Sequence, residues 1–449
     1  MLSTSLVALD STILATAVPS IVADIGGFTE FPWLFSIYLL AQAVTVPIYG
    51  KLADLFGRKP VILAGIALFL LGSTLCGLAW SMGALVGFRL VQGLGAGAIM
   101  PMTITIAGDI YTTEERAVAQ GYMASIWGMS AVVGPTLGGV FSEYVSWRWI
   151  FLVNVPLCLL AAAMVTRNFR ERVERTRPSI DYAGAALLTG GLTLLILALL
   201  EGGQLWAWAS PAGIGTVAAG LALLTGFVLV ERRVSEPVLP LWVFRRRLLI
   251  TSGLASAAVG AVLLGLTSYI PTYVQEVLGH GPVVAGFALA TLTIGWPIAA
   301  SRSGLIYLRY GFRTCAVIGT SVVVAGTALL LLLDEHTSVW QVAAACLVIG
   351  AGMGLTASPT LIAAQSSVGW HERGVVTANN LFLRSVGSAV GIAVFGALAN
   401  AVLDGDHRTP ETLTDAVQRI VVVLVVLSLV MLAAALALPG RVPTGESRA

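Results

Sequence analysis

Long runs of apolar residues dominate this chain and constrain its fold more than any other feature. A helix needs about 20 apolar residues to cross a bilayer. Only 11% of the 449 residues are charged, whereas soluble domains carry roughly 25%. We therefore predict an all-α polytopic membrane protein. Its fourteen transmembrane helices are expected near residues 5–24, 32–52, 61–80, 83–107, 117–141, 148–166, 182–201, 211–230, 249–272, 283–302, 314–333, 339–363, 375–402 and 418–438.

Basic residues alternate between the predicted loops, and this alternation supports the helix count. The even-numbered loops and the C-terminal tail hold 20 Lys and Arg residues, whereas the odd-numbered loops hold 3. Basic residues bias short loops toward the cytoplasm. We therefore expect both termini to be cytoplasmic, in a protein of the inner (plasma) membrane.

The chain contains an internal duplication. Gly50 and Gly57 of the segment GKLADLFGRK recur as Gly304 and Gly311 of GLIYLRYGFR, at an offset of 254, and GLGAG recurs as GAGMG at 257. Parallel repeats of six helices are common in secondary transporters, with the substrate site between the halves near the midplane. We predict two six-helix bundles related by pseudo-two-fold symmetry, at 1–166 and 248–440, with a two-helix insert and its basic cytoplasmic loops at 167–247 and a cytoplasmic tail at 441–449.

Two charged side chains, Asp10 and Arg89, lie inside predicted spans of the first half. A charge at the bilayer centre costs about 2.5–3.5 kcal/mol, so such residues usually face an interior cavity and act there. The repeat aligns Asp10 with residues 264–267 and Arg89 with Cys346, which are uncharged. This asymmetry assigns ion coupling to the N-terminal half.

Each of these two residues also has a plain structural interpretation. Asp10 can load and release a proton as access alternates, or it can make a structural hydrogen bond to a neighbouring helix. Arg89 stays protonated in a protein, so it either tunes a nearby proton carrier or forms a structural pair between helices. Sodium is an alternative to the proton.

Other residues are candidates for a cavity inside the protein. Arg384 lies in the thirteenth span, where it could meet an anionic substrate group or extend toward the cytoplasm. Trp127 and Trp296 could line the cavity or simply pack in the core. Gln92 lies three residues after Arg89, on the same helix face.

The sequence lacks the motifs of an energy-coupling or catalytic site. It contains no G-x-x-x-x-G-K-[ST] segment, so an ion gradient must supply the energy. The four cysteines lie far apart without CxxC spacing. We expect no enzymatic activity, no cofactor and no metal.

Several motifs together resemble the fourteen-helix drug:proton antiporter family of the major facilitator superfamily. They are the first-helix segment 9–19, the loop segment 50–59, Arg89 with Gln92-Gly93, the fifth-helix glycines Gly128, Gly134, Gly138 and Gly139 with Pro135, and the sixth-helix segment 147–156. The resemblance covers nearly the whole chain. The second copy of the loop departs from the first, because Leu308 stands where the first copy has Asp54.

The resemblance implies a proton-coupled secondary transporter that exports amphiphilic small molecules, as in multidrug efflux, by alternating access. It assigns proton coupling to Asp10 and Arg89. A gating loop would comprise Gly50, Asp54, Gly57, Arg58 and Lys59, although Arg58 and Lys59 alone could reflect topology. The fifth-helix motif would pack helices tightly, and in the sharper interpretation it would seal the protein against ion leak.

Other functions remain open from the sequence. The chain could export an endogenous lipid, siderophore or antibiotic. In a different class, it could be a non-transporting receptor or scaffold whose basic loops, at 167–180 and 231–247, bind a partner or anionic lipid. The expected partners are an amphiphilic substrate, protons and the lipid bilayer, with no nucleic acid, and the expected state is a monomer.

Overall fold

The computed structural model describes residues 1–26, 33–169, 171, 181–201, 206–207, 209–234, 237–402 and 410–440. The secondary-structure elements in these ranges are all helices. Eleven of the described helices are long and apolar enough to cross a membrane, and shorter apolar stretches cover Leu2–Leu14 and Tyr182–Ala198. The all-helical, multi-pass architecture is confirmed, whereas the count of fourteen and the two-bundle layout stay predictions. The predicted tail at 441–449 and residues 172–180 of the basic loop lie outside the described residues.

The chain divides into two compact units. The first unit comprises residues 1–109, 129–241 and 370–382, and the second comprises residues 110–128, 242–369 and 383–449. Two long helices, α5 (Thr113–Tyr144) and α14 (Arg373–Val402), are divided between the units, with one part of each helix in each unit. The predicted domain boundaries come from the sequence repeat, whereas these units are defined by contacts, so the predicted boundaries stay predictions.

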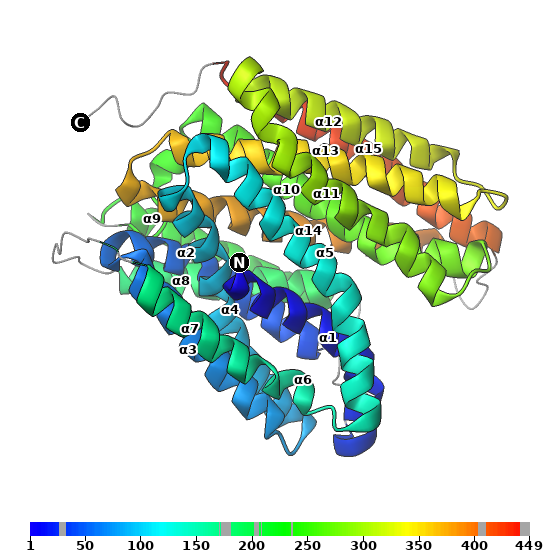
Figure 1. The fold of residues 1–449 in the computed structure, drawn as a ribbon, viewed down its shortest axis with the longest axis horizontal. Helices are drawn as coiled ribbons and strands as arrows, with labels where there is room; N and C mark the ends of the chain where they lie inside the picture. The colour runs from blue at the N-terminus through cyan, green and yellow to red at the C-terminus, as the bar shows by residue number, and fades with distance from the viewer. Residues whose placement is uncertain are drawn as a thin grey trace. The chain divides into compact units, whose positions relative to one another are not determined.

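The first unit contains the N-terminal helices and the helix pair that the sequence places in the insert. Its helices are α1 (Leu2–Ile25), α2 (Trp33–Phe56), α3 (Arg58–Gly77), α4 (Met82–Ile110), α6 (Trp149–Leu152), α7 (Asn154–Asn168), α8 (Tyr182–Glu201) and α9 (Pro211–Glu231) (Figure 1). The inserted helices α8 and α9 pack against each other, and α8 also contacts α2. They approach each other closely at Gly191 and Gly220, where a Cβ on Gly191 would lie 3.1 Å from the Gly220 carbonyl oxygen.

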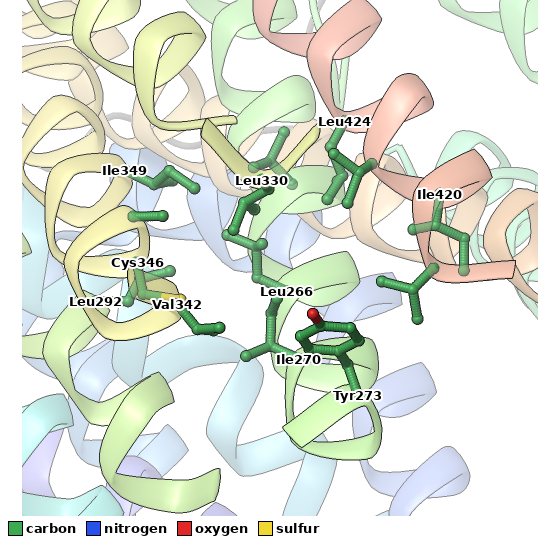
Figure 2. Close-up of a cluster of buried hydrophobic side chains, with 14 of the residues drawn as sticks. Leu266, Ile270, Tyr273, Leu292, Leu330, Val342, Cys346, Ile349, Ile420 and Leu424 are labelled. Atoms are coloured by element: carbon green, nitrogen blue, oxygen red, sulfur yellow. The ribbon is translucent and has the colours of Figure 1, made fainter. Parts of the chain in front are cut away.

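The second unit has one large hydrophobic core. Its helices are α10 (Arg247–Thr272), α11 (Pro282–Tyr310), α12 (Phe312–Leu329), α13 (Val339–Ser366) and α15 (Pro410–Leu436). Three short helical turns accompany them: η1 (Leu241–Phe244), η2 (Tyr273–Val277) and η3 (Leu330–Leu332). A fourth turn, η4 (Trp370–Glu372), belongs to the first unit. Within this unit α13 packs against both α11 and α12, and α15 packs against α10 and α12. Their buried side chains form the cluster drawn in Figure 2.

The duplicated loop has the same backbone conformation in both copies. Gly57, between α2 and α3, has φ 95° and ψ 160°, and Gly311, between α11 and α12, has φ 89° and ψ 159°. This left-handed region is unfavourable for residues with a Cβ, so glycine allows the chain to reverse direction in a single residue.

The predicted span 148–166 is interrupted in the structure. It corresponds to α6 and α7, which meet at Val153. Pro156 follows three residues later and has no N–H to donate to the Leu152 carbonyl, so the helical hydrogen-bond ladder is broken there. The break places Asn154 at the start of α7, where its amide points into the polar cluster described below.

Candidate functional site

The side chain of Asp10 lies in a buried polar cluster of the first unit. Its Oδ2 atom accepts a hydrogen bond from Nη1 of Arg89 at 2.6 Å, and both side chains are only 1% exposed. Arg89 lies seven residues after the start of α4, and Asp10 lies eight residues after the start of α1. The structure thus brings together the two charges that the sequence places in separate spans.

Uncharged polar groups satisfy the other oxygen of Asp10. Oδ1 accepts from the side-chain amide of Gln92 at 2.7 Å and from that of Asn154 at 3.2 Å. Ser73 of α3 links these two amides, because its Oγ accepts from each of them at 3.0 Å. Four helices therefore meet at one carboxylate through a connected network, which makes a buried charge tolerable.

Arg89 is held on its other sides by α2 and α4. Its Nε donates to the Leu34 carbonyl at 3.1 Å, and its Nη1 also donates to Oε1 of Gln92 at 2.7 Å. The guanidinium lies over the Tyr38 ring at 4.1 Å, a cation–π distance. Such multiple fixation is what a planar guanidinium provides and a lysine would not.

The corresponding region of the second unit is apolar. An offset of 257 aligns Arg89, Gln92 and Ser73 with Cys346, Ile349 and Leu330, all of which belong to the cluster in Figure 2. Leu266, within the stretch aligned with Asp10, is a member too. Among these aligned residues, all of which the structure describes, the polar network occurs in the first copy only.

A second charged cluster lies where α2 ends and α3 begins, and we call it the clamp: Asp54, Arg58, Asp109, Trp370 and Arg373. The Asp54 carboxylate accepts hydrogen bonds from the backbone N–H groups of Gly374 at 2.9 Å and Val375 at 2.7 Å, in the first turn of α14. A carboxylate at this place also complements the helix dipole.

Arg58 connects the rest of the clamp. Its guanidinium is fully buried and forms ion pairs with Asp54 at 3.0 Å and Asp109 at 3.1 Å. It also lies 3.8 Å from the centroid of the Trp370 ring and donates a hydrogen bond to the Trp370 carbonyl oxygen. Arg373 pairs with the other oxygen of Asp109 at 3.0 Å. The clamp therefore fastens the α2–α3 corner to the start of α14 through charged groups.

The equivalent positions of the second unit make this contact with a hydroxyl in the place of the Asp109 carboxylate. Arg116 aligns with Arg373 and Ser366 with Asp109, and Nη1 of Arg116 donates to Oγ of Ser366 at 3.1 Å. Leu308, which replaces Asp54, is exposed. The charged clamp belongs to one copy of the loop.

The other residues of the predicted gating loop have separate contacts. Gly50 permits close approach of α14, because a Cβ on it would lie 2.9 Å from the Gly374 carbonyl oxygen. The backbone N–H groups of Arg58 and Lys59 donate to the Glu171 carboxylate, each at 2.9 Å, so Glu171 caps the start of α3.

The predicted fifth-helix motif packs against two different helices. Within the first unit, a Cβ on Gly134 would collide with Oγ1 of Thr12, two residues after Asp10, and Thr12 donates to the Ser130 carbonyl at 2.8 Å. Within the second unit, a Cβ on Gly128 would lie 3.2 Å from the Thr293 carbonyl oxygen. Gly138 is buried, Gly139 has open space beside it, and the side chain of Pro135 lies outside the described residues.

The four candidate cavity residues are divided between the two units. Gln92 belongs to the Asp10 cluster. Arg384 and Trp296 lie together in the second unit, with the guanidinium 5.0 Å from the ring centroid. Trp127 is half-buried in the second-unit part of α5.

Sequence reasoning did not select several residues that the two clusters contain. Ser73 and Asn154 are ordinary polar residues in apolar helices, and only their hydrogen bonds reveal their role. Asp109 and Arg373 lie near predicted helix ends, where charges are common. An acid just beyond the end of a predicted span, such as Asp109, could have been found by searching for a basic partner at a distant helix end.

Comparison with known proteins gives a family for this arrangement. The sequence profile of the Major Facilitator Superfamily matches residues 1–392. Multidrug resistance protein 3 of Bacillus subtilis is 34% identical over 395 residues, which are 88% of this chain and 77% of that protein. Multidrug transporter protein MdtP, also of Bacillus subtilis, is 35% identical over 408 residues, or 91% of this chain and 74% of that protein.

A solved structure has a similar fold. The human organic anion transporter MFSD10 superposes with a TM-score of 0.67 at 14% sequence identity, over 95% of this chain and 97% of that one. At this identity the likeness concerns the fold alone.

Proposed function

On the premise that the chain belongs to the major facilitator superfamily, a family of transporters, we propose that it is a proton-coupled exporter of amphiphilic small molecules. Membership in this family also fits a protein that is not an enzyme. The two Bacillus relatives are both named as multidrug proteins, which supports drug efflux. The proposed location is the inner membrane, with both termini in the cytoplasm.

The observation that carries the proposal is the buried carboxylate of Asp10 with its Arg89 partner. An ionisable acid inside a membrane helix bundle is costly and usually functional. The Asp10 carboxylate accepts hydrogen bonds from the Gln92 and Asn154 side-chain amides as well as from Arg89. It can therefore exchange a proton when the pair with Arg89 opens to water.

The proposed cycle couples this exchange to access. In one state Asp10 faces the outside and takes up a proton. Protonation neutralises the carboxylate and thereby breaks its ion pair with Arg89. In the other state it faces the cytoplasm and returns the proton as substrate binds. Because one carboxylate is exposed to each side in turn, the proton flux inward drives the substrate flux outward.

The clamp supplies the proposed gate. Asp54, Arg58 and Asp109 hold the start of α14 with charge-assisted hydrogen bonds, which are stronger than neutral ones. These contacts stabilise the transport state in which they are formed relative to the state in which they are broken. Opening the cytoplasmic side would require them to break, so the clamp sets the balance between states.

Reconstitution in liposomes tests the proposal. Purified protein is reconstituted with a pH-sensitive dye inside, and candidate amphiphiles such as ethidium are added outside under a pH gradient. We expect compound-dependent proton movement that persists when sodium is replaced by potassium. Compound movement that depends on sodium and is indifferent to the pH gradient would reject proton coupling, and no compound-dependent flux at all would favour the receptor interpretation.

A further inference from the structure

Arg384 is a cation within a predicted span, and no described residue pairs with it as an anion. Among the residues that the structure describes, its guanidinium has neither an ion pair nor a hydrogen-bond acceptor, and its contact is the Trp296 ring at 5.0 Å. Arg58 and Arg89, by contrast, are paired with carboxylates. An unpaired charge in a membrane helix is costly and is usually retained for a function.

The position of Arg384 argues against a role in topology. It lies eleven residues after the start of α14, which corresponds to about 16 Å along the helix. This is about half of a hydrocarbon core of roughly 30 Å. A side chain extending to the membrane surface would leave Trp296, whereas the structure holds the guanidinium over that ring.

Both side chains start from backbone that is fixed by close helix contacts within the second unit. A Cβ on Gly260 of α10 would collide with the Arg384 carbonyl oxygen, and a Cβ on Gly387 would collide with the Ala257 carbonyl oxygen. On α11, a Cβ on Gly295 would lie 2.5 Å from the Leu347 carbonyl oxygen. A site on such closely packed helices is held in place, which favours binding.

The chemistry of the pair selects a class of ligand. A guanidinium that lies over an aromatic ring keeps the N–H donors at its own edge free, where they fit the two oxygens of a carboxylate, sulfonate or phosphate. The Trp296 ring beside it offers apolar surface for the body of the same molecule. Arg384 is half-buried, so part of it stays open to a ligand.

We propose that Arg384, backed by Trp296, binds the anionic group of amphiphilic substrates. The inference rests on the proposed export function and names the substrate class, which would include anionic and zwitterionic compounds. The same chemistry could be satisfied by the headgroup of an anionic lipid.

A matched pair of probes tests the inference. Dansylglycine carries a carboxylate, whereas dansylglycinamide carries a neutral amide in its place. Binding of both is measured by dansyl fluorescence with protein in phosphatidylcholine nanodiscs, and transport of both is measured in liposomes beside the cation ethidium. We expect the wild type to bind dansylglycine about 10- to 100-fold more tightly than the amide. R384Q should abolish this preference, and R384K should keep part of it.

The matched control is R246Q. Arg246 also stacks on a tryptophan, Trp242 at 4.3 Å, but it is exposed and lies just before α10. R246Q should leave the preference unchanged, and thermal unfolding shows whether each variant is folded. If R384Q does not fold, R384K tests the inference instead, because its preference for dansylglycine over the amide should be weaker than that of the wild type.

The outcomes separate this inference from the export function. Equal binding of the two probes by the wild type, or a preference that survives R384Q, overturns the inference even if ethidium is transported. Absence of all transport rejects the export function, while the binding comparison still decides the role of Arg384. If phosphatidylglycerol added to the nanodiscs removes the wild-type preference by competition, the site is confirmed and the anion is a lipid headgroup.

Discussion

Nη1 of Arg89 lies 2.6 Å from Oδ2 of Asp10, in a place from which water is almost fully excluded. Removing two charges from water costs more than their attraction returns unless further hydrogen bonds satisfy them. Gln92, Asn154 and the Leu34 carbonyl provide those bonds here. Any step that exposes Asp10 to water must therefore open a connected network.

The first prediction concerns Asp10 itself. Asp10→Asn keeps the size and an acceptor oxygen but cannot carry a proton, so export driven by a pH gradient should fall to the leak level while the protein still folds. Export is measured as ethidium uptake into inverted vesicles, and folding by thermal unfolding in detergent.

Asp24→Asn is the matched control for this change. Asp24 lies on the same helix but is about half exposed, where it pairs with Arg148 at 2.6 Å. It should retain most of the export activity. A well-folded Asp10→Asn protein that exports as the wild type does would reject the coupling role.

The second prediction concerns the stability of the pair. Arg89→Gln leaves the Asp10 carboxylate buried without its cation, and losing one partner of a buried pair costs about 3–5 kcal/mol. The double variant, with Asp10→Asn added, removes the orphaned charge and should regain most of that loss. Unfolding free energies or melting temperatures in detergent measure the coupling, and simple additivity of the two changes would contradict a buried ion pair.

The sequence predicts the helical membrane fold and part of the polar cluster around Asp10, for physical reasons. Apolar runs report membrane helices directly, and charges within them stand out because they are costly, which is why Asp10 and Arg89 could be selected. Their contact could not be predicted, because helix packing depends on which faces of α1 and α4 meet. Ser73 could not be selected, since a polar uncharged residue costs less in a span than a charge does, and Asn154 stood out only as part of the motif segment 147–156.

The partners within the clamp could not be predicted from the sequence either. Asp54 and Arg58 are recognisable by their motif, but their partners lie far along the chain, at Asp109 and in the first turn of α14. Arg373 is one of many basic residues near helix ends, so topology alone explains it from sequence. Only the fold shows that the Asp109 carboxylate joins two arginines.

The third prediction concerns the clamp. Asp54→Ala removes the acceptor of the Gly374 and Val375 N–H groups and the partner of Arg58. Hydrogen bonds to a charged group contribute about 1.5–3 kcal/mol each, so the balance between transport states should shift at least tenfold and the export rate should fall.

The shift can be read from a cysteine at Ala378, a buried position of α14 beside Gly50. The four native cysteines are buried, so background labelling should be low. A membrane-impermeant maleimide should react faster with this cysteine when Asp54→Ala is present. Leu308→Ala, at the exposed position of the second copy, should change neither the labelling nor the rate, and equal effects of the two changes would argue against a charged clamp.

The fourth prediction concerns the packing of α5 against α1. In Gly134→Ala the new methyl group meets Oγ1 of Thr12, and Thr12 cannot turn aside without losing its hydrogen bond to the Ser130 carbonyl. The helices must separate slightly, at a cost of about 1–3 kcal/mol, and Asp10 lies two residues from the contact. Both the melting temperature and gradient-driven export should therefore fall. Gly139→Ala adds the same methyl group in the same motif where there is open space, so it should be neutral. If the two variants behave alike, the motif acts through helix propensity rather than through close packing beside Asp10.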